Sequence, residues 1–300
     1  MLEAISKDIF LVKGMNRGRF PYSHSILILS HNKKYVLIDT GCGIETLKKI
    51  NEKFNIEYIL NSHGHPDHCA GNWVFNNQAP PIYVPKEGFK TAGNLLELSN
   101  RFTEPGYLAE YWRGNIAKLL KFNEFKPTHT YEEKSQFEIG NITLQPIHTP
   151  GHTTDHYCLY EPHHEILFSF DIDFTSFGPW YGHRESSISE FKKSIDKLKD
   201  LPIKLVVSGH REIVSSNFSR HFETFYHKFK ERDGRILALL EQGPKFIEQL
   251  VNEAPIYGSF PYAEVLLRYW EEQMIKKHLK QLIKKDLVII ADNNLYEITT

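Results

Sequence analysis

The sequence has few cysteines, no long apolar run and almost no net charge. Its three cysteines, Cys42, Cys69 and Cys158, are too few and too scattered for a disulfide framework, which indicates a reducing compartment. No apolar run approaches the roughly 20 residues that a membrane-spanning helix needs. A net charge of -1 argues against a broad nucleic-acid footprint, although it leaves room for a local basic patch.

The amino terminus also lacks the basic start and apolar core of a signal peptide, so we expect a cytoplasmic protein. What the chain does have is the composition of an ordinary soluble globular protein, with 41% hydrophobic and 24% charged residues. Its 300 residues are enough for one large core and a small second domain.

Residues 61–73 are the most informative stretch of the chain. A short apolar run predicts a buried strand, and directly after it come His63, His65, Asp67 and His68. Imidazole and carboxylate groups suit Zn²⁺, and also Fe or Mn. A merely polar loop would not be expected to show this His-x-His-x-Asp-His spacing, so the sequence predicts a metal site on the loop that leaves the strand.

The residues before this loop predict a β-rich start followed by a βαβ-like unit. Apolar runs at 9–12, 25–29 and 35–38 predict strands, and a helix is expected over 44–54. Asp39 follows the third run. A simple turn would explain it, but a carboxylate at a strand end beside a metal loop is also suited to hold a ligand histidine by a hydrogen bond.

Three later strands are each followed by a metal-binding residue type. His152 follows a Pro-Gly turn, which can present the next side chain towards a pocket. One apolar run ends at Asp171, and a last one precedes His210. Asp173 would share a face with Asp171 on a continuing strand, so the residues alone do not choose between these two carboxylates.

Together these segments resemble the metallo-β-lactamase superfamily, and in order and spacing they are nearest its glyoxalase II-like hydrolases. The resemblance covers roughly residues 1–215. It implies an α/β fold (α+β by some schemes), built as a four-layer αβ/βα sandwich. It rests on four blocks in the family's order, namely His63-x-His65-x-Asp67-His68, Thr149-Pro-Gly-His152-Thr, Leu167-Phe-Ser-Phe-Asp171 and Val207-Ser-Gly-His210.

The same resemblance implies two divalent metal ions, with zinc the first choice and iron or manganese as alternatives. Asp171 would bridge both ions together with a water or hydroxide, although Phe170 stands where the family usually has glycine. A bridging carboxylate argues against a true β-lactamase, since those enzymes usually lack it. By resemblance, His63, His65 and His152 hold one ion, and Asp67, His68 and His210 hold the other.

Two segments are expected to shape the substrate site. Residues 89–125 predict a helical insertion rich in aromatics, which serves as core, as a lid over the metals, or as both. The Gly/Pro-punctuated loop 177–184 comes soon after the predicted bridging aspartate. We therefore expect its Tyr181, His183 and Arg184 to contact the substrate.

The composition shifts from strands to helices after the last ligand, which predicts a catalytic domain at 1–220 and a second domain at 221–300. Three helices closed by a hairpin, with its turn at 292–294, resemble the winged helix of a lactamase-like branch that includes endoribonucleases. Lysines gather on the last helix, but acidic residues balance the basic ones over the domain. A solvated helix face therefore explains them better than a nucleic-acid platform. Dimerisation or support of the lid is at least as good a role for this domain as phosphate binding.

The predicted function is a binuclear metal-dependent hydrolase that acts on a small ester, thioester or lactone through a bridging hydroxide. Asp67 is the candidate for orienting the attacking water and taking its proton. The alternative is a phosphodiesterase or endoribonuclease with the winged helix as nucleic-acid platform. An iron-dependent redox enzyme resembling persulfide dioxygenases is disfavoured, because it needs only half of the ligand set. The expected partner is a small-molecule substrate, and a homodimer stays open.

Overall fold

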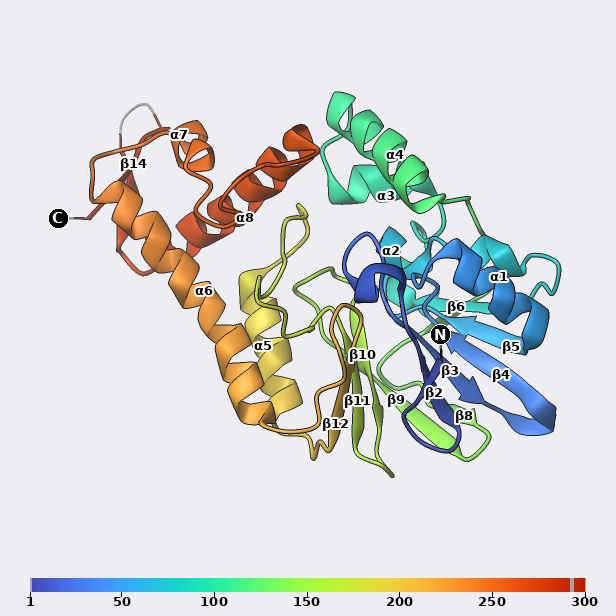
Figure 1. Ribbon diagram of the computed structural model, residues 1–300. Coiled ribbons are helices and arrows are strands. Elements are labelled where there is room, and N and C mark those ends of the chain that lie inside the picture. Colours follow the sequence, from blue (N-terminus) through green and yellow to red (C-terminus); the bar gives the residue numbers. More distant parts are fainter. Residues whose placement is uncertain (1, 292–293, 300) are drawn as a thin grey trace.

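Two β-sheets packed face to face form the centre of the molecule (Figure 1). The structure is a computed structural model that describes residues 2–291 and 294–299. Within them, the first sheet has the spatial order β1 (Leu2–Ala4), β2 (Ile9–Val12), β3 (Ser25–Leu29), β4 (Lys34–Ile38), β5 (Asn55–Leu60), β6 (Ile82–Pro85), β7 (His129–Tyr131). The second has the order β12 (Leu205–Ser208), β11 (Ile166–Phe170), β10 (Tyr157–Glu161), β9 (Ile142–His148), β8 (Phe137–Ile139).

Strand β4 shows how the apolar runs build two cores at once. Val36 and Ile38 lie in the core between the sheets, where they join Phe168 and Val207 of the second sheet. Leu37 points to the opposite face, because successive side chains alternate along a strand, and it joins the core beneath the helices. Each such buried side chain contributes roughly 1.5–3 kcal/mol.

Helices cover the outer face of each sheet, which gives four layers (Figure 1). In α5 the buried residues Phe191, Ile195 and Leu198 recur at helical spacing and pack on the second sheet. This arrangement confirms the four-layer fold that the sequence predicts. The first sheet carries α1 (Ile44–Lys53), α2 (Pro66–Cys69), α3 (Leu95–Phe102) and α4 (Tyr107–Leu120), and the second carries α5 (Ile188–Lys199) and α6 (Phe218–Leu240).

The predicted insertion at 89–125 contains α3 and α4. Phe102 and Trp112 are buried in the core of the first sheet, whereas Tyr107 is 71% exposed. Phe102 also ends α3 with its ring 5.0 Å from the ring of His65. The insertion therefore contributes to the core and reaches the predicted metal loop. Single 3-10 turns lie at η1 (Met15–Gly18), η2 (His31–Lys33), η3 (Asn72–Phe75) and η4 (Lys86–Gly88).

The C-terminal region consists of α6, α7 (Ile247–Asn252), α8 (Glu264–Lys284), β13 (Val288–Ile290) and β14 (Tyr296–Ile298). Leu279 and Val288 belong to the same hydrophobic core as Leu167 of the second sheet, so the core of this sheet continues into the C-terminal region. Figure 1 shows α8 extending towards α4 beyond the edge of the sheets. The predicted turn at 292–294 lies partly outside the described residues, and the winged-helix resemblance stays a prediction. Among the described helices, none has the length and apolar character to cross a bilayer.

Candidate metal centre

The predicted metal ligands lie where the strands of both sheets end. β4 and β5 are parallel neighbours, so Asp39 lies beside the loop that carries His63 and His65. In the second sheet β11 runs parallel to β12, so Asp171 and His210 emerge at the same edge. The carboxyl ends of parallel strands are where α/β folds place their ligands. The strand pairing therefore explains why residues far apart in sequence meet here.

Seven side chains gather at this edge in two groups, and within each group the potential ligand atoms lie within 4.8 Å of one another. All are buried except His210, which is partly exposed. The division is the one that the family resemblance implies. The first group is His63, His65, His152 and Asp171, and the second is Asp67, His68 and His210.

Asp171 faces both groups, one with each carboxylate oxygen. Its Oδ2 lies 2.8 Å from His152 Nε2, 3.8 Å from His63 Nε2 and 3.9 Å from His65 Nδ1. Its Oδ1 lies 2.8 Å from His68 Nε2 and 3.4 Å from His210 Nε2. This is the geometry that a carboxylate shared between two cations requires.

Asp173, the other candidate, points elsewhere. Strand β11 ends at Phe170, whose φ of 47° is a left-handed conformation that favours glycine. The chain therefore leaves the strand direction, and Asp173 does not share a face with Asp171. Its Oδ1 instead accepts hydrogen bonds from the backbone N–H and the hydroxyl of Thr175. Burial raises the pKa of Asp173 to about 6, with the nearby Asp171 charge adding to the shift.

The hydrogen bonds of the second group leave its imidazole lone pairs facing one another. His68 Nδ1 donates to Asp39 Oδ2 at 2.8 Å, and His210 Nδ1 donates to the carbonyl of Gly18 at 2.7 Å. In the neutral rings the two Nε2 atoms are then acceptors, yet they lie only 3.3 Å apart. Two acceptors at this distance need a positive charge between or beside them.

The first group has the same property. His152 Nδ1 donates to the carbonyl of Trp180 at 2.8 Å, so its Nε2 is an acceptor in the neutral ring. Ser62 Oγ donates to Asp39 at 2.7 Å and accepts the Nδ1 proton of His63 at 3.0 Å. This leaves His63 Nε2 buried without a hydrogen-bond partner in the described part of the chain. A buried acceptor is costly to leave unpaired, so these donor sets fit divalent cations.

The pKa values show the same demand for positive charge. Burial lowers the pKa of His63 well below its ordinary value, so its lone pair is available at neutral pH. Burial opposes the charged form of His210 too, but the carboxylates of Asp171 and Asp67 outweigh it and raise its pKa to about 9. The pKa of Asp171 is held well below its ordinary value, because the neighbouring histidines, His68 first, outweigh the effect of burial. The carboxylates of Asp171 and Asp67 therefore attract positive charge to this site.

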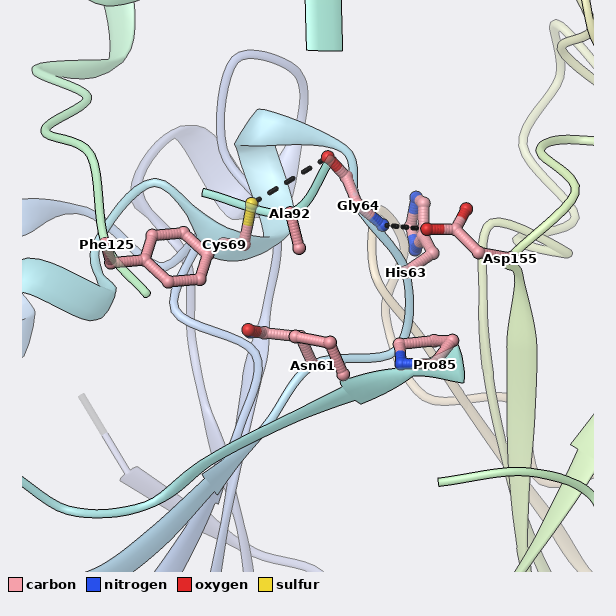
Figure 2. A pocket seen from close by; sticks show the side chains of 9 residues that line it. Asn61, His63, Gly64, Cys69, Pro85, Ala92, Phe125 and Asp155 are labelled. Carbon is pink, nitrogen blue, oxygen red and sulfur yellow. Dashed lines mark hydrogen bonds between the residues drawn. The ribbon is translucent and has the colours of Figure 1, made fainter. Parts of the chain in front are cut away.

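Sequence reasoning missed Asp155, which helps to fix the loop between His63 and His65. Figure 2 shows the backbone N–H of Gly64 donating to Asp155 Oδ2, at 3.1 Å, and the Cys69 thiol pointing to the carbonyl of Gly64. Asp155 belongs to the His152 loop and therefore ties the two ligand loops together. The one sequence signal was an acidic residue three positions after a predicted ligand.

The three residues predicted to contact substrate lie in different environments. Tyr181 is fully buried, and its hydroxyl lies 2.7 Å from His278 Nε2 and 2.8 Å from Arg232 Nη1. His183 is also buried, with its Nε2 2.7 Å from His65 Nε2. This geometry favours supporting roles for both. Arg184 is exposed, and its contact with substrate stays a prediction.

Residues 18–210 match the metallo-beta-lactamase superfamily, and the chain belongs to this superfamily. Its fold is similar to that of a metallo-beta-lactamase family protein from Thermus thermophilus, with a TM-score of 0.75 and 20% identity. The similarity covers 98% of this chain and 100% of that one.

Two curated relatives extend the comparison. The beta-lactamase-like protein 2 homolog of Caenorhabditis elegans is 24% identical over 300 residues, which cover 96% of this chain and 88% of that protein. An acyl-coenzyme A thioesterase of Bos taurus is 23% identical over 216 residues, or 67% of this chain and 74% of that protein. Identities of 23–24% agree with membership of the same superfamily, and they do not identify the substrate of this chain.

Proposed function

We propose that the chain is a binuclear metal-dependent hydrolase of a small thioester, ester or lactone. The observation that carries the proposal is that two buried groups of potential metal ligands lie on either side of Asp171, which contacts both of them. Two bound divalent cations, zinc by first choice, would lower the pKa of a water between them and polarise the substrate carbonyl. A site that used one ion would need only one of the two clusters.

Asp67 is the residue that we assign to the proton. Its backbone carbonyl accepts the hydroxyl of Ser23 at 2.8 Å, and its Oδ2 lies 3.5 Å from His210 Nε2. The carboxylate orients the attacking water and accepts its proton while the water oxygen adds to the carbonyl. The C–S or C–O bond then breaks, and the departing thiolate or alkoxide takes up this proton. The rings of Phe102 and Trp180 lie 5.0 and 5.8 Å from that of His65 and limit the access of bulk water.

The cysteines support attack by water rather than by a thiolate. Cys42, Cys69 and Cys158 are all buried, and burial raises the pKa of each thiol, to about 12 for Cys42 and Cys158. A thioester is the substrate class that we place first, because the matched bovine relative is an acyl-coenzyme A thioesterase. The likeness to glyoxalase II stays a prediction.

The phosphodiesterase alternative finds less support in the lysines of α8. Lys276 pairs with Glu272, and the amino group of Lys277 donates to the carbonyl of His183 at 2.8 Å. Lys285, directly after α8, lies 3.6 Å from Asp233. Three of the lysines that could hold a phosphate backbone therefore have internal partners.

Zinc-loaded protein assayed against thioesters, lactones, carboxylic esters and bis-nitrophenyl phosphate tests the proposal. We expect hydrolysis of a carboxyl substrate, and we expect Asp67→Asn to lower kcat by about 10²- to 10⁴-fold with bound metal retained. Asp196→Asn, on the exposed face of α5, is the matched control and should leave kcat unchanged. Cleavage of the phosphodiester alone would overturn the choice of substrate class, and an unchanged kcat in Asp67→Asn would overturn the role of Asp67.

A further inference from the structure

The loop 177–184 lies against the candidate metal centre through two of its residues. The carbonyl of Trp180 accepts the Nδ1 proton of His152, as described above. His183 reaches the second ligand of the same group, with its Nε2 2.7 Å from His65 Nε2. One loop therefore touches two of the three histidines of the first group.

The hydrogen bonds of His183 determine which nitrogen of His65 carries the proton. His183 Nδ1 lies 3.2 Å from the carbonyl of Phe102, which can only accept, so Nδ1 is the protonated nitrogen. In the neutral ring, Nε2 of His183 is then an acceptor, and His65 Nε2 must donate to it. His65 Nδ1 is left with a free lone pair, and it is this atom that faces Asp171 and His152.

The surroundings of His183 hold its ring in one position. The ring stacks on Phe102, with centroids 4.0 Å apart and planes inclined by 14°, and the side chain is 3% exposed. The backbone carbonyl of His183 accepts from Lys277 of α8 at 2.8 Å, which fixes the loop from its other side.

Residues of the C-terminal region secure the rest of the loop. Arg232 of α6 donates to the carbonyls of Phe177 and Pro179, each at 2.6 Å. The indole N–H of Trp180 donates to the hydroxyl of Tyr257 at 2.7 Å. The position of the loop therefore depends on residues of the C-terminal region, whereas its polar contacts on the inner side are made with metal-ligand histidines.

We propose that His183 is a positioning residue, which holds His65 in the tautomer with Nε2 protonated and Nδ1 free to bind a metal ion. The role rests on the proposed metal centre. His183 supplies no ligand atom of its own, because both of its ring nitrogens are engaged. Hydrogen-bond partners of this kind typically change metal affinity by 10- to 100-fold when they are removed.

Two substitutions at this position separate the hydrogen bond from the packing. His183→Leu keeps an apolar side chain against Phe102 but removes the acceptor, and His183→Gln keeps an acceptor oxygen. Competition against a chromophoric chelator should show that His183→Leu binds one zinc ion per chain about 10- to 100-fold more weakly, with the second ion unaffected. His183→Gln should recover most of this loss. His129→Leu is the matched control, since His129 stacks on Tyr83 away from both ligand groups, and its zinc affinities should equal those of the wild type.

A spectroscopic measurement tests the tautomer without any variant. In the metal-free wild type, long-range ¹⁵N–¹H correlation spectra should show His65 protonated at Nε2, and a ring protonated at Nδ1 overturns the proposal. If the wild type binds two zinc ions and His183→Leu binds both with wild-type affinity, the positioning role is wrong and the metal centre stands. If the wild type binds no zinc, the metal centre falls and the positioning role falls with it.

Discussion

Arg101 shows how a single buried side chain holds the loops around the candidate metal centre. Its guanidinium lies 2.6 Å from Asp155 Oδ1 and 2.7 Å from Glu185 Oε1. Arg101 belongs to α3, so the insertion is joined by this pair of contacts to the loop of His152 and to the segment after His183. A planar guanidinium suits two carboxylates better than lysine would, because its donors form a rigid fork.

Replacing Arg101 by methionine should destabilise the metal-free protein at pH 7 by about 3–5 kcal/mol, since it leaves two largely buried carboxylates without a partner. Urea unfolding of the two proteins measures this difference. Lys86→Met is the control, because the exposed pair of Lys86 with Glu132 should be worth at most about 1 kcal/mol. A loss as small as that of the control would mean that the buried carboxylates find other partners.

The same variant has a defined pH dependence. Burial would raise the pKa of Asp155, but Arg101 outweighs it and lowers the pKa from 3.8 to about 2. A lowered folded-state pKa stabilises the protein above pH 4, and this contribution of about 2 kcal/mol is lost as the pH falls towards 2. In Arg101→Met the carboxyl of Asp155 lacks this partner, so in the folded state it can take up a proton at a pH well above 2. The stability deficit of the variant should therefore be smaller at pH 3 than at pH 7, and a deficit independent of pH would contradict this assignment.

At the level of elements, the turn before His152 is tightly constrained by its packing against α5. Gly151 has a φ of 131°, and a Cβ added there would lie 2.3 Å from both the Cα and the N of Phe191 in α5. Its carbonyl also accepts the N–H of Ser187, the N-cap residue of that helix, at 2.9 Å. The close approach of backbone to helix therefore requires glycine, and it sets the position from which His152 projects.

Gly151→Ala should cost about 3 kcal/mol or more, because it combines a disfavoured backbone conformation with a clash against main-chain atoms that cannot move aside. We also expect weaker zinc binding, since His152 would be displaced. Thermal unfolding of the metal-free protein measures the first effect, and chelator competition measures the second.

Gly114→Ala is the matched control for this substitution. Gly114 lies inside α4 with no atom within 4 Å of an added Cβ, so alanine should stabilise the helix by about 0.5–1 kcal/mol. Similar stability of the two alanine variants would show that the turn can relax around a side chain.

At the scale of the whole molecule, the residues that the sequence revealed are those with a local signal. His63, Asp171 and His210 each follow a run of apolar residues, and a strand followed by a metal-binding side chain can be recognised without knowledge of its neighbours. The helices and the hairpin at the C-terminal end could be predicted for the same reason, because the spacing of their apolar residues is visible within each segment.

What the sequence could not show is which segments meet. The contact of His183 with His65 joins residues more than a hundred positions apart, and it depends on how the loop 177–184 packs beneath the C-terminal helices. Arg101 and Asp155 likewise pair between an inserted helix and a distant loop. The shared core of Leu167, Leu279 and Val288 also joins the regions on either side of the predicted boundary at 220. The division into two domains therefore stays a prediction.

Metal removal should lower the stability of the whole protein without unfolding it. Three hydrophobic clusters form the core independently of the ligands, so the chelated protein should keep its secondary structure. Each zinc ion present at 100 times its Kd stabilises the folded state by about 2.7 kcal/mol, so two ions give about 5 kcal/mol. For a chain of this length that corresponds to a fall in Tm on the order of 10 °C, which calorimetry before and after chelation measures.

The metal content and a second variant decide how that shift is interpreted. Elemental analysis of the untreated protein should find about two divalent ions per chain. Asp171→Ala removes the carboxylate that faces both groups, so chelation should lower its Tm much less than that of the wild type. About one ion per chain, or an equal shift in Asp171→Ala, would contradict a shared site. If two ions lie on either side of Asp171, chelation should lower the Tm of the wild type by the full amount, and added zinc should restore it. In Asp171→Ala, added zinc should not raise the Tm to the same extent.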